Sequence, residues 1–359
     1  MRGFLWKITL VVAFVASVAP SQAQQLRVGA DFTTFFDNKE YTSLSADESC
    51  TLFSARLTPK VGIAWAECNE LMFGVDMVQE FGHDAKFLSD VGVQLYYALR
   101  APRVKVLAGI FPRSEMRGLQ QPLFFDRDYR YYHHTIAGVL VRYESAKHSG
   151  SYVEMAMDYT GMRDRLVRES FDITLSAYHR IKGLELGLDG IMRHYGKDLD
   201  YTTDDGVVDN LLVVPYVGYE LSVKGFDLDF RLSYMQALQR DRHFENRWQA
   251  PMGGELYCAV SRWGVTLANR LYVGGCLMPF MSRYGASLYH GERLYATAEG
   301  IVESAQLSYC RSFFDDTLSV GAGITLDYDG TGIGTRQWVQ LDVKLDYGID
   351  LRRKQRELN

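Results

Sequence analysis

The segment 112–134 gathers the densest set of side chains that could do chemistry in this chain. It combines four arginines, two aspartates and five aromatic residues: Arg113, Arg117, Phe124, Phe125, Asp126, Arg127, Asp128, Tyr129, Arg130, Tyr131 and Tyr132. Burying one such ring contributes roughly 1.5 to 3 kcal/mol, so we expect the segment to fold onto the rest of the protein. Arginines and aspartates that face one another across an opening create a transverse field that orients dipolar solutes. The sequence therefore predicts either a charged constriction or a packed loop that covers one end of the fold.

Two further loops were candidates for binding chemistry. Residues 274–300 are rich in tyrosine and include His290, so this loop could stack on a solute or simply pack on its neighbours. Residues 193–210 carry five aspartates, whose oxygens suit calcium, but their spacing does not match an EF-hand loop. A solvated acidic loop is the preferred interpretation. We expect no metal site and no cofactor.

Hydrolytic chemistry at a membrane surface would need a serine beside a histidine on the lipid-facing side. His179 is the one histidine whose position alternates outward, and no serine of the same parity lies beside it. His133, His134 and His290 lie in long loops, where an aspartate-assisted site is conceivable. The chain has no G-x-S-x-G and no H-E-x-x-H motif. The sequence therefore predicts a protein that is not an enzyme and has no catalytic residue.

The elements that must position these loops are strands with alternating residue types. In residues 338–351, apolar side chains at odd positions alternate with polar ones such as Gln340, Asp342 and Lys344. Successive strand side chains point to opposite faces, so this segment has one apolar and one charged face. The pattern recurs in about sixteen segments. Leu140 falls on the polar side of its segment and Asn269 on the apolar side, which a β-bulge or a shifted boundary would explain.

The connections between these segments alternate between short and long. Residues 224–225 form a short one, whereas residues 112–134 and 274–300 form long ones. This alternation is typical of transmembrane barrels, with short periplasmic turns and long extracellular loops. The predicted fold class is an all-β, antiparallel, up-and-down transmembrane barrel of about sixteen strands. A secreted β-sandwich or propeller is the alternative, but the chain has no fixed blade period.

The chain begins with the features of a secretory signal peptide. Arg2 and Lys7 precede an apolar run over residues 8–18 and a small-residue cleavage site at 21–23. Residues 1–23 are therefore expected to be removed, and residues 24–359 to form a single barrel domain. Acidic residues outnumber basic ones by 44 to 39, so nucleic acid is not an expected partner. Of the five cysteines, Cys50 and Cys276 could form a bridge, and unpaired thiols are the alternative.

On these patterns the chain resembles the porin-like outer-membrane barrels of Gram-negative bacteria. The resemblance implies export to the outer membrane, contact with its lipid, and passive diffusion of small polar solutes or ions. It also implies that the loop 112–134 bends into the lumen and narrows the pore, and a homotrimer is one assembly it allows. A plugged barrel that serves as a surface receptor or structural anchor is the alternative.

The lumen-facing positions of the predicted strands supply charges of both signs to the interior. They include Arg56, Lys60, Asp76, Arg142, Asp158, Asp229, Arg231, Arg270, Asp342 and Lys344. Rings of lysine and arginine would indicate phosphate selectivity, and a run of aromatic residues would indicate sugar selectivity. The mixed set identifies no solute.

Overall fold

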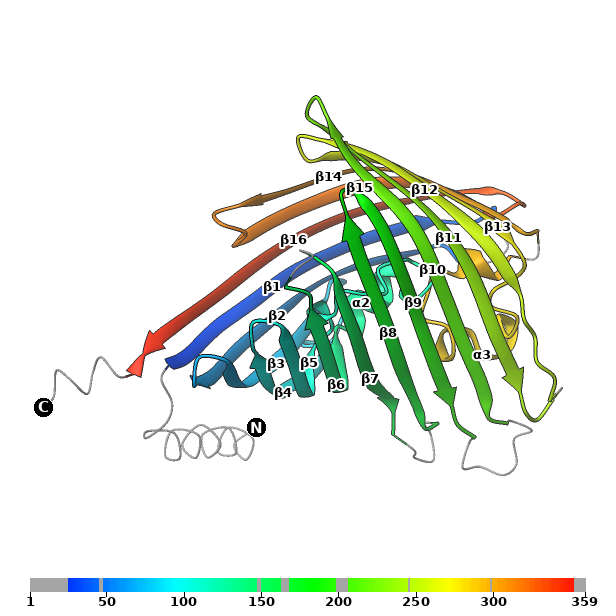
Figure 1. Cartoon of the computed structure of the whole chain (residues 1–359). Coiled ribbons are helices and arrows are strands. Elements are labelled where there is room, and N and C mark those ends of the chain that lie inside the picture. Colours follow the sequence, from blue (N-terminus) through cyan, green and yellow to red (C-terminus); the bar gives the residue numbers. More distant parts are fainter. Residues whose placement is uncertain are drawn as a thin grey trace, which may run out of the picture.

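A computed structural model describes residues 25–351, except 45–47, 147–149, 163–167, 198–205, 245 and 298. In this part of the chain, sixteen strands close into one barrel (Figure 1). Every strand pairs antiparallel with its neighbours in sequence, and β1 pairs with β16 to close the wall. The predicted fold class is confirmed. The predicted signal peptide lies outside the described residues, as do four of the five aspartates of the acidic loop 193–210.

The strand bounds follow the alternating segments closely. They are β1 (Gln25–Glu40), β2 (Cys50–Trp65), β3 (Asn69–Glu80), β4 (Asp90–Arg100), β5 (Val104–Pro112), β6 (Thr135–Glu144), β7 (Tyr152–Gly161), β8 (Ser170–Ile181), β9 (Leu184–Tyr195), β10 (Val208–Val223), β11 (Phe226–Asp241), β12 (Met252–Arg262), β13 (Val265–Gly274), β14 (Ile301–Phe313), β15 (Leu318–Tyr328) and β16 (Ile333–Asp350). Five short helices lie in two long connections: η1 (Arg113–Glu115), α2 (Arg127–Tyr132), α3 (Met281–Tyr284), η2 (Gly285–Ser287) and η3 (Arg293–Ala296). No helix among the described residues is long and apolar enough to cross a bilayer.

The tight turns at one rim are set by residues that accept a left-handed backbone. Lys224 and Gly225 join β10 to β11 with φ angles of 51° and 80°. Trp263 and Gly264 join β12 to β13 with φ angles of 54° and 85°. Two consecutive positive φ angles are the mark of the type I′ hairpin, whose twist matches that of the strands. Because successive connections alternate between the two rims, the long connections lie at the opposite rim.

The two faces of the wall differ in chemistry, as the alternation predicts. On β11, Leu232 points outward and is 58% exposed, whereas the next residue, Ser233, points into the lumen and is 3% exposed. Apolar side chains such as Phe230 and Val339 continue this outward surface on other parts of the wall. An apolar outer belt around a partly polar interior is the arrangement that a bilayer requires of a barrel.

The two exceptions to the alternation are not caused by bulges. Strand β6 stays in continuous register with β5 and β7, and Leu140 faces the lumen, where it is fully buried. Asn269 does face outward from β13, again in continuous register, and its side-chain amide donates to Glu303 Oε1 at 3.0 Å. The bulge explanation was wrong for both residues. Leu140 is buried there because part of the lumen is an apolar core.

Candidate functional site

Two long connections fold into the barrel and together form what we call the plug, residues 113–134 and 275–297 (Figure 1). The first segment leaves β5 and crosses to the opposite wall. Gly118 lies so close to β8 that a Cβ atom there would be 2.1 Å from Ser176 Cβ. The Leu119 amide donates to Asp189 Oδ1 at 3.3 Å, and Gln121 Nε2 donates to Ser233 Oγ at 3.2 Å. These contacts fasten the segment to β8, β9 and β11.

Helix α2 then carries the segment back to the first and last strands. Asp126 begins the helix by accepting a hydrogen bond from the Tyr129 amide at 2.6 Å. Arg127 lies 3.9 Å from the Trp338 ring centroid and 3.2 Å from Asp37 Oδ2. Asp128 pairs with Lys39 at 2.8 Å and with Arg336 at 3.0 Å. The path of the first segment therefore runs across the whole lumen and back.

The second segment packs on the first through backbone contacts. The Asp126 amide donates to the His290 carbonyl at 2.7 Å, and the Glu292 amide donates to the Pro122 carbonyl at 2.8 Å. Between them Gly291 allows the chains to touch, because a Cβ atom there would be 1.9 Å from the Leu123 carbonyl oxygen. The two segments are thus one packed unit.

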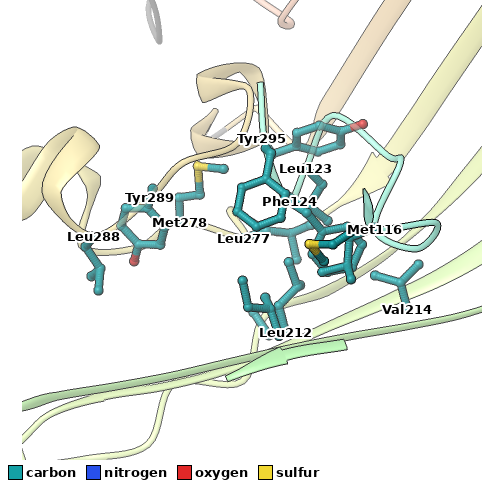
Figure 2. Close-up of a cluster of buried hydrophobic side chains, with 14 of the residues drawn as sticks. Met116, Leu123, Phe124, Leu212, Val214, Leu277, Met278, Leu288, Tyr289 and Tyr295 are labelled. Carbon is teal, nitrogen blue, oxygen red and sulfur yellow. The ribbon is translucent and has the colours of Figure 1, made fainter. Parts of the chain in front are cut away.

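The plug shares an apolar core with the wall, shown in Figure 2. Leu123 and Phe124 of the first segment meet Leu277 and Leu288 of the second, and each of the four is at most 2% exposed. On the wall side the same cluster includes Leu212, Val214, Leu140 and Ile191, among other residues. Fully burying a Leu or Phe side chain stabilises by roughly 1.5 to 3 kcal/mol, so this core holds the plug firmly in place.

The eleven residues predicted at the constriction all lie in the plug, where four are buried, six are half-buried and one is exposed. Phe124 and Phe125 are each 2% exposed, and Tyr131 stacks on Phe35 with ring centroids 4.3 Å apart. Arg113 pairs with Asp158 at 2.6 Å, and Arg130 Nη2 donates to the Leu119 carbonyl at 2.5 Å. Tyr132 lines the cavities at the outer rim that are described below. Arg117, with a side chain 41% exposed, is the member most open to solvent. Their role in setting a pore stays a prediction.

The ten predicted lumen residues occupy inward positions, and most are paired there. Lys60 binds Asp31 at 2.9 Å, Arg142 binds Glu154 at 3.0 Å, and Arg270 binds Glu255 at 2.7 Å. Asp342 Oδ1 accepts from Thr33 Oγ1 at 2.8 Å, and Arg56 contacts the Tyr131 carbonyl. Lys344 lies opposite Asp31 in the β1–β16 register. The remaining four, Asp76, Asp158, Asp229 and Arg231, belong to the sites described below and in the last section.

An outer vestibule lies between the plug and the wall on the side of the long loops. It is a cavity of about 690 Å³ whose lining includes Asp76, Arg113, His133, His134 and Asp158. A second cavity of about 390 Å³ shares Tyr129, Tyr132, His133 and His290 with it. Tyr129 stacks between two imidazoles, with centroids 4.5 Å from His133 and 4.0 Å from His290. The vestibule therefore joins aromatic, imidazole and carboxylate groups in one space.

The strand wall is split beside this vestibule. Strand β4 pairs with β5 only between Leu95–Arg100 and Lys105–Ile110, so residues 90–94 pair with β3 alone. The vestibule is lined there both by Val93 and Tyr159, which are exposed on the outside of the barrel, and by lumen-facing Asp76. A cavity lined by side chains from both faces of a wall connects the lumen with the outer surface.

His134 and Asp76 form the pair in the vestibule that is best arranged for acid–base chemistry. Asp76 is 3% exposed, and its oxygens accept from Thr58 at 2.5 Å and from Gln94 at 3.0 Å. His134 Nε2 lies 2.8 Å from Asp76 Oδ1, at ion-pair distance but without the alignment of a regular hydrogen bond. The other ring nitrogen, Nδ1, has no hydrogen-bond partner among the described residues. Both ring nitrogens are buried, and a carboxylate beside the imidazole of a histidine is the pair of groups that a general base uses.

His290 differs from His134 because its neighbouring carboxylate is already neutralised. Asp172 Oδ2 lies 3.8 Å from His290, but Arg193 holds both Asp172 oxygens at 2.6 and 2.9 Å. Burial, followed by the charges of Arg193 and Arg113, lowers the pKa of His290 well below its usual value. His290 is therefore a neutral ring that stacks on Tyr129, whereas Asp76 has no arginine or lysine partner among the described residues.

Two details of the sequence interpretation need correction. Ser151 does lie beside His179, with Oγ 3.1 Å from Nδ1, because Tyr152 at the start of β7 lies opposite Tyr178 of β8. His179 is also not alone in facing outward, since β9 extends to Tyr195 and His194 stacks on outward-facing Phe171 at 4.9 Å. Cys50 and Cys276 form no disulfide, and neither do the other cysteines. The pairing of His134 with Asp76 was missed because the two residues lie in different elements, far apart in the sequence.

Solved structures that resemble this chain are porin-type barrels. The Pseudomonas aeruginosa outer membrane protein OpdK is 10% identical with a TM-score of 0.52, over 90% of this chain and 99% of that one. A loop-deletion mutant of OmpT from Vibrio cholerae is 11% identical with a TM-score of 0.51, over 90% of this chain and 99% of that one. At this identity the likeness concerns the fold, and it confirms the resemblance to Gram-negative outer-membrane barrels. A search of curated protein sequences found no match.

A family model described as "Lipid A 3'-O-deacylase-type" matches residues 18–354. A deacylase is an enzyme, so the prediction that this chain belongs to a non-enzymatic class is wrong. The sequence reasoning considered an aspartate-assisted site at the histidines of the long loops, but it found no serine hydrolase or zinc motif and assigned no aspartate to any of these histidines. Since the match runs over nearly the entire barrel, the chain belongs to the lipid A 3'-O-deacylase-type family.

Proposed function

We propose that this chain is an outer-membrane hydrolase that removes an ester-linked acyl chain from a lipid A-type glycolipid. The observation that carries the proposal is the His134–Asp76 pair inside a vestibule that opens to the outer surface of the barrel. Family membership supports the reaction class. The plug supports it as well, because a barrel whose lumen holds an apolar core is suited to be a rigid scaffold for a site.

The proposed reaction is ester hydrolysis with His134 as the base. His134 takes a proton from a water molecule as the water oxygen attacks the ester carbonyl carbon. The bond between the acyl carbon and the sugar oxygen then breaks, and the proton passes to that oxygen, which leaves as a hydroxyl group. Asp76 stabilises the imidazolium that exists between these two steps. The products are a free fatty acid and a glycolipid that has lost one acyl chain.

The experiment is acyl release from purified lipid A in detergent micelles, followed by mass spectrometry. We expect His134→Gln and Asp76→Asn to lower the rate by on the order of 10² to 10⁴-fold, the usual contribution of general base catalysis. His83→Gln is the matched control, because His83 is exposed in a long loop at the same rim. No release by the wild-type protein, or full activity in His134→Gln, would refute the proposal.

We propose passive conduction of small polar solutes as a second candidate function. It is favoured by the charged wall on the far side of the plug, where the side chains of Arg180 and Glu220 are each 40% exposed. Planar-bilayer recording separates the two candidates. If the wild-type protein conducts ions and Arg117→Ala changes its ion selectivity, the channel gains support. If only a variant that lacks residues 119–132 conducts, the plug closes the native barrel and the channel function fails.

A further inference from the structure

We propose that the lumen on the periplasmic side of the plug carries a saccharide-binding site, formed by Tyr178, Glu185, Tyr216, Asp229 and Arg231. This site lies apart from the vestibule and does not depend on the proposed hydrolase activity. It rests on a row of aromatic rings, a group of unpaired buried polar atoms, and an opening toward the short-turn rim.

The strand register places the aromatic residues in one row. Tyr152 of β7 lies opposite Tyr178 of β8, which lies opposite Gly187 of β9, which in turn lies opposite Tyr216 of β10. The Tyr152 and Tyr178 rings are stacked, with centroids 5.8 Å apart. The Tyr216 ring covers Gly187 so closely that a Cβ atom there would be 1.9 Å from Tyr216 Cζ. The absent side chain at Gly187 makes room for the Tyr216 ring, and the Arg231 guanidinium carbon lies 4.8 Å from the centroid of that ring.

Charged groups lie in the adjacent row, nearer the short turns. Glu185 lies opposite Gly218, which lies opposite Arg231, so no side chain stands between the carboxylate and the guanidinium. Arg231 Nη2 is 3.7 Å from Glu185 Oε2 and 4.0 Å from Asp229 Oδ2. These separations are longer than a hydrogen bond. The two carboxylates and the arginine therefore lie close together without a hydrogen bond between them.

Three atoms in this group are buried and have no hydrogen-bond partner in the part of the chain that the structure describes. They are Glu185 Oε2, Asp229 Oδ1 and Arg231 Nε. Glu185 is 1% exposed, and its other oxygen accepts from the Tyr178 hydroxyl. Buried polar atoms are almost always paired, and each one left unpaired costs about 1 to 3 kcal/mol. Three orphaned atoms around one space indicate that a polar ligand completes the site.

The chemistry of the groups favours a neutral sugar over an ion. Two carboxylates and one guanidinium give a net charge of −1, which repels phosphate, and Arg231 already serves both carboxylates as their counter-ion. A sugar presents hydroxyl groups that both donate and accept, which suits carboxylate oxygens and a guanidinium at once. The C–H face of a sugar packs on aromatic rings, and Tyr178 and Tyr216 lie beside these charged groups. A saccharide satisfies both halves of the site.

The site is reachable from the short-turn rim. Inward side chains near that rim are open to solvent, with Asp229 30% exposed and Arg180 and Glu220 each 40% exposed. The plug forms its inner boundary, because Arg117 lies over the Tyr152 ring with its guanidinium carbon 4.8 Å from the centroid. A ligand would therefore enter from the periplasm and stop beneath the plug.

Isothermal titration calorimetry of the detergent-solubilised protein tests the proposal, with maltotriose and the N-acetylglucosamine trimer as probes. We expect saturable binding of at least one probe, weakened at least tenfold by Tyr216→Ala and by Glu185→Gln. Tyr219→Ala is the matched control, because Tyr219 lies on the same strand but is 45% exposed on the outer face. Heat-modified migration on gels verifies that each variant has folded.

The possible failures are distinct. No heat of binding with either trisaccharide at millimolar concentration overturns the site, and so does binding that survives both substitutions. Binding of inorganic phosphate in place of the saccharides would show that the charge argument is wrong. None of these outcomes bears on His134, so acyl release from lipid A tests the proposed function separately.

Discussion

The outer and inner halves of the lumen contain similar side chains in different surroundings. In the outer half, Arg336 and Asp37 pair at 2.8 Å with side chains 7% and 1% exposed. In the inner half, Arg180 and Glu220 pair at 2.5 Å with both side chains 40% exposed. The difference is the plug, which removes water from the outer half and leaves it in the inner half. Ion pairs of the same residue types are thus buried and stabilise the fold in the outer half, whereas they are accessible to solvent in the inner half.

The largest effect is expected from the apolar core that creates this difference. Phe124→Ala should lower the free energy of unfolding by about 3 to 5 kcal/mol, because it leaves a cavity between the plug and the wall. Phe87→Ala is the control, since Phe87 is 86% exposed, and it should change stability by no more than about 0.5 kcal/mol. Urea unfolding in detergent micelles measures both. Equal effects would mean that the plug is not a packed unit.

A matched pair of arginine substitutions compares the two halves directly. Arg336→Gln leaves Asp37, Asp128 and Glu292 without their shared cation, which should cost about 3 to 5 kcal/mol for buried charges. Arg180→Gln breaks a half-exposed pair, which is worth at most about 1 kcal/mol. The same unfolding assay should rank the two variants in this order. A reversed order would show that the outer half is hydrated.

The contact between the plug and β8 should respond to a single methyl group. Gly118→Ala would place a Cβ atom 2.1 Å from Ser176 Cβ, and such overpacking costs about 1 to 3 kcal/mol. Gly190→Ala is the control, because a Cβ atom there would find its nearest neighbour at 3.6 Å. Thermal unfolding of the two variants gives the comparison. Similar melting temperatures would place the first plug segment away from the wall.

A further effect concerns pH. Burial, with the charges of Glu292 and Asp128, raises the pKa of Asp126 from 3.8 to about 7. The folded protein therefore keeps this proton more tightly than the unfolded chain, so its stabilising contribution is complete below pH 3.8 and is lost as pH rises toward 7. Asp126→Asn should flatten this part of the stability profile, whereas Asp84→Asn in an exposed loop should leave it unchanged. An unaltered slope in Asp126→Asn would contradict the assignment.

The wall of the barrel could be predicted from sequence because its rule is local. Side chains alternate with a period of two, so the position of Asp229 or Leu232 in its strand is enough to predict whether it faces the lumen or the outer surface. Leu140 shows what the alternation of side chains does not predict. Its parity was right, but whether the lumen beside it holds water or a plug depends on residues such as Phe124 that lie elsewhere in the chain.

The sites were harder to predict than the wall because they depend on contacts between distant elements. Asp76 was assigned to the lumen and His134 to a loop, and only the folded plug brings them within 2.8 Å. Arg231 was likewise assigned to the lumen, whereas Glu185 was not singled out, and Gly218 lies between the two in the strand register. Sequence gives the direction of a side chain in a strand, and it does not give the distance across three strands.

Helix α2 touches both strands that complete the barrel, and this has a consequence for biogenesis. Arg127 contacts Asp37 of β1 and Gln340 of β16, and Asp128 contacts Lys39 of β1 and Arg336 of β16. Strand β16 is made last, so the two sides of the seam can only meet after α2 is available to bridge them. The helix would then act as a latch: its contacts with β1 and β16 would form only when the seam closes and the finished barrel leaves the assembly machinery. A chain with a damaged latch would stall at that late stage with an open seam.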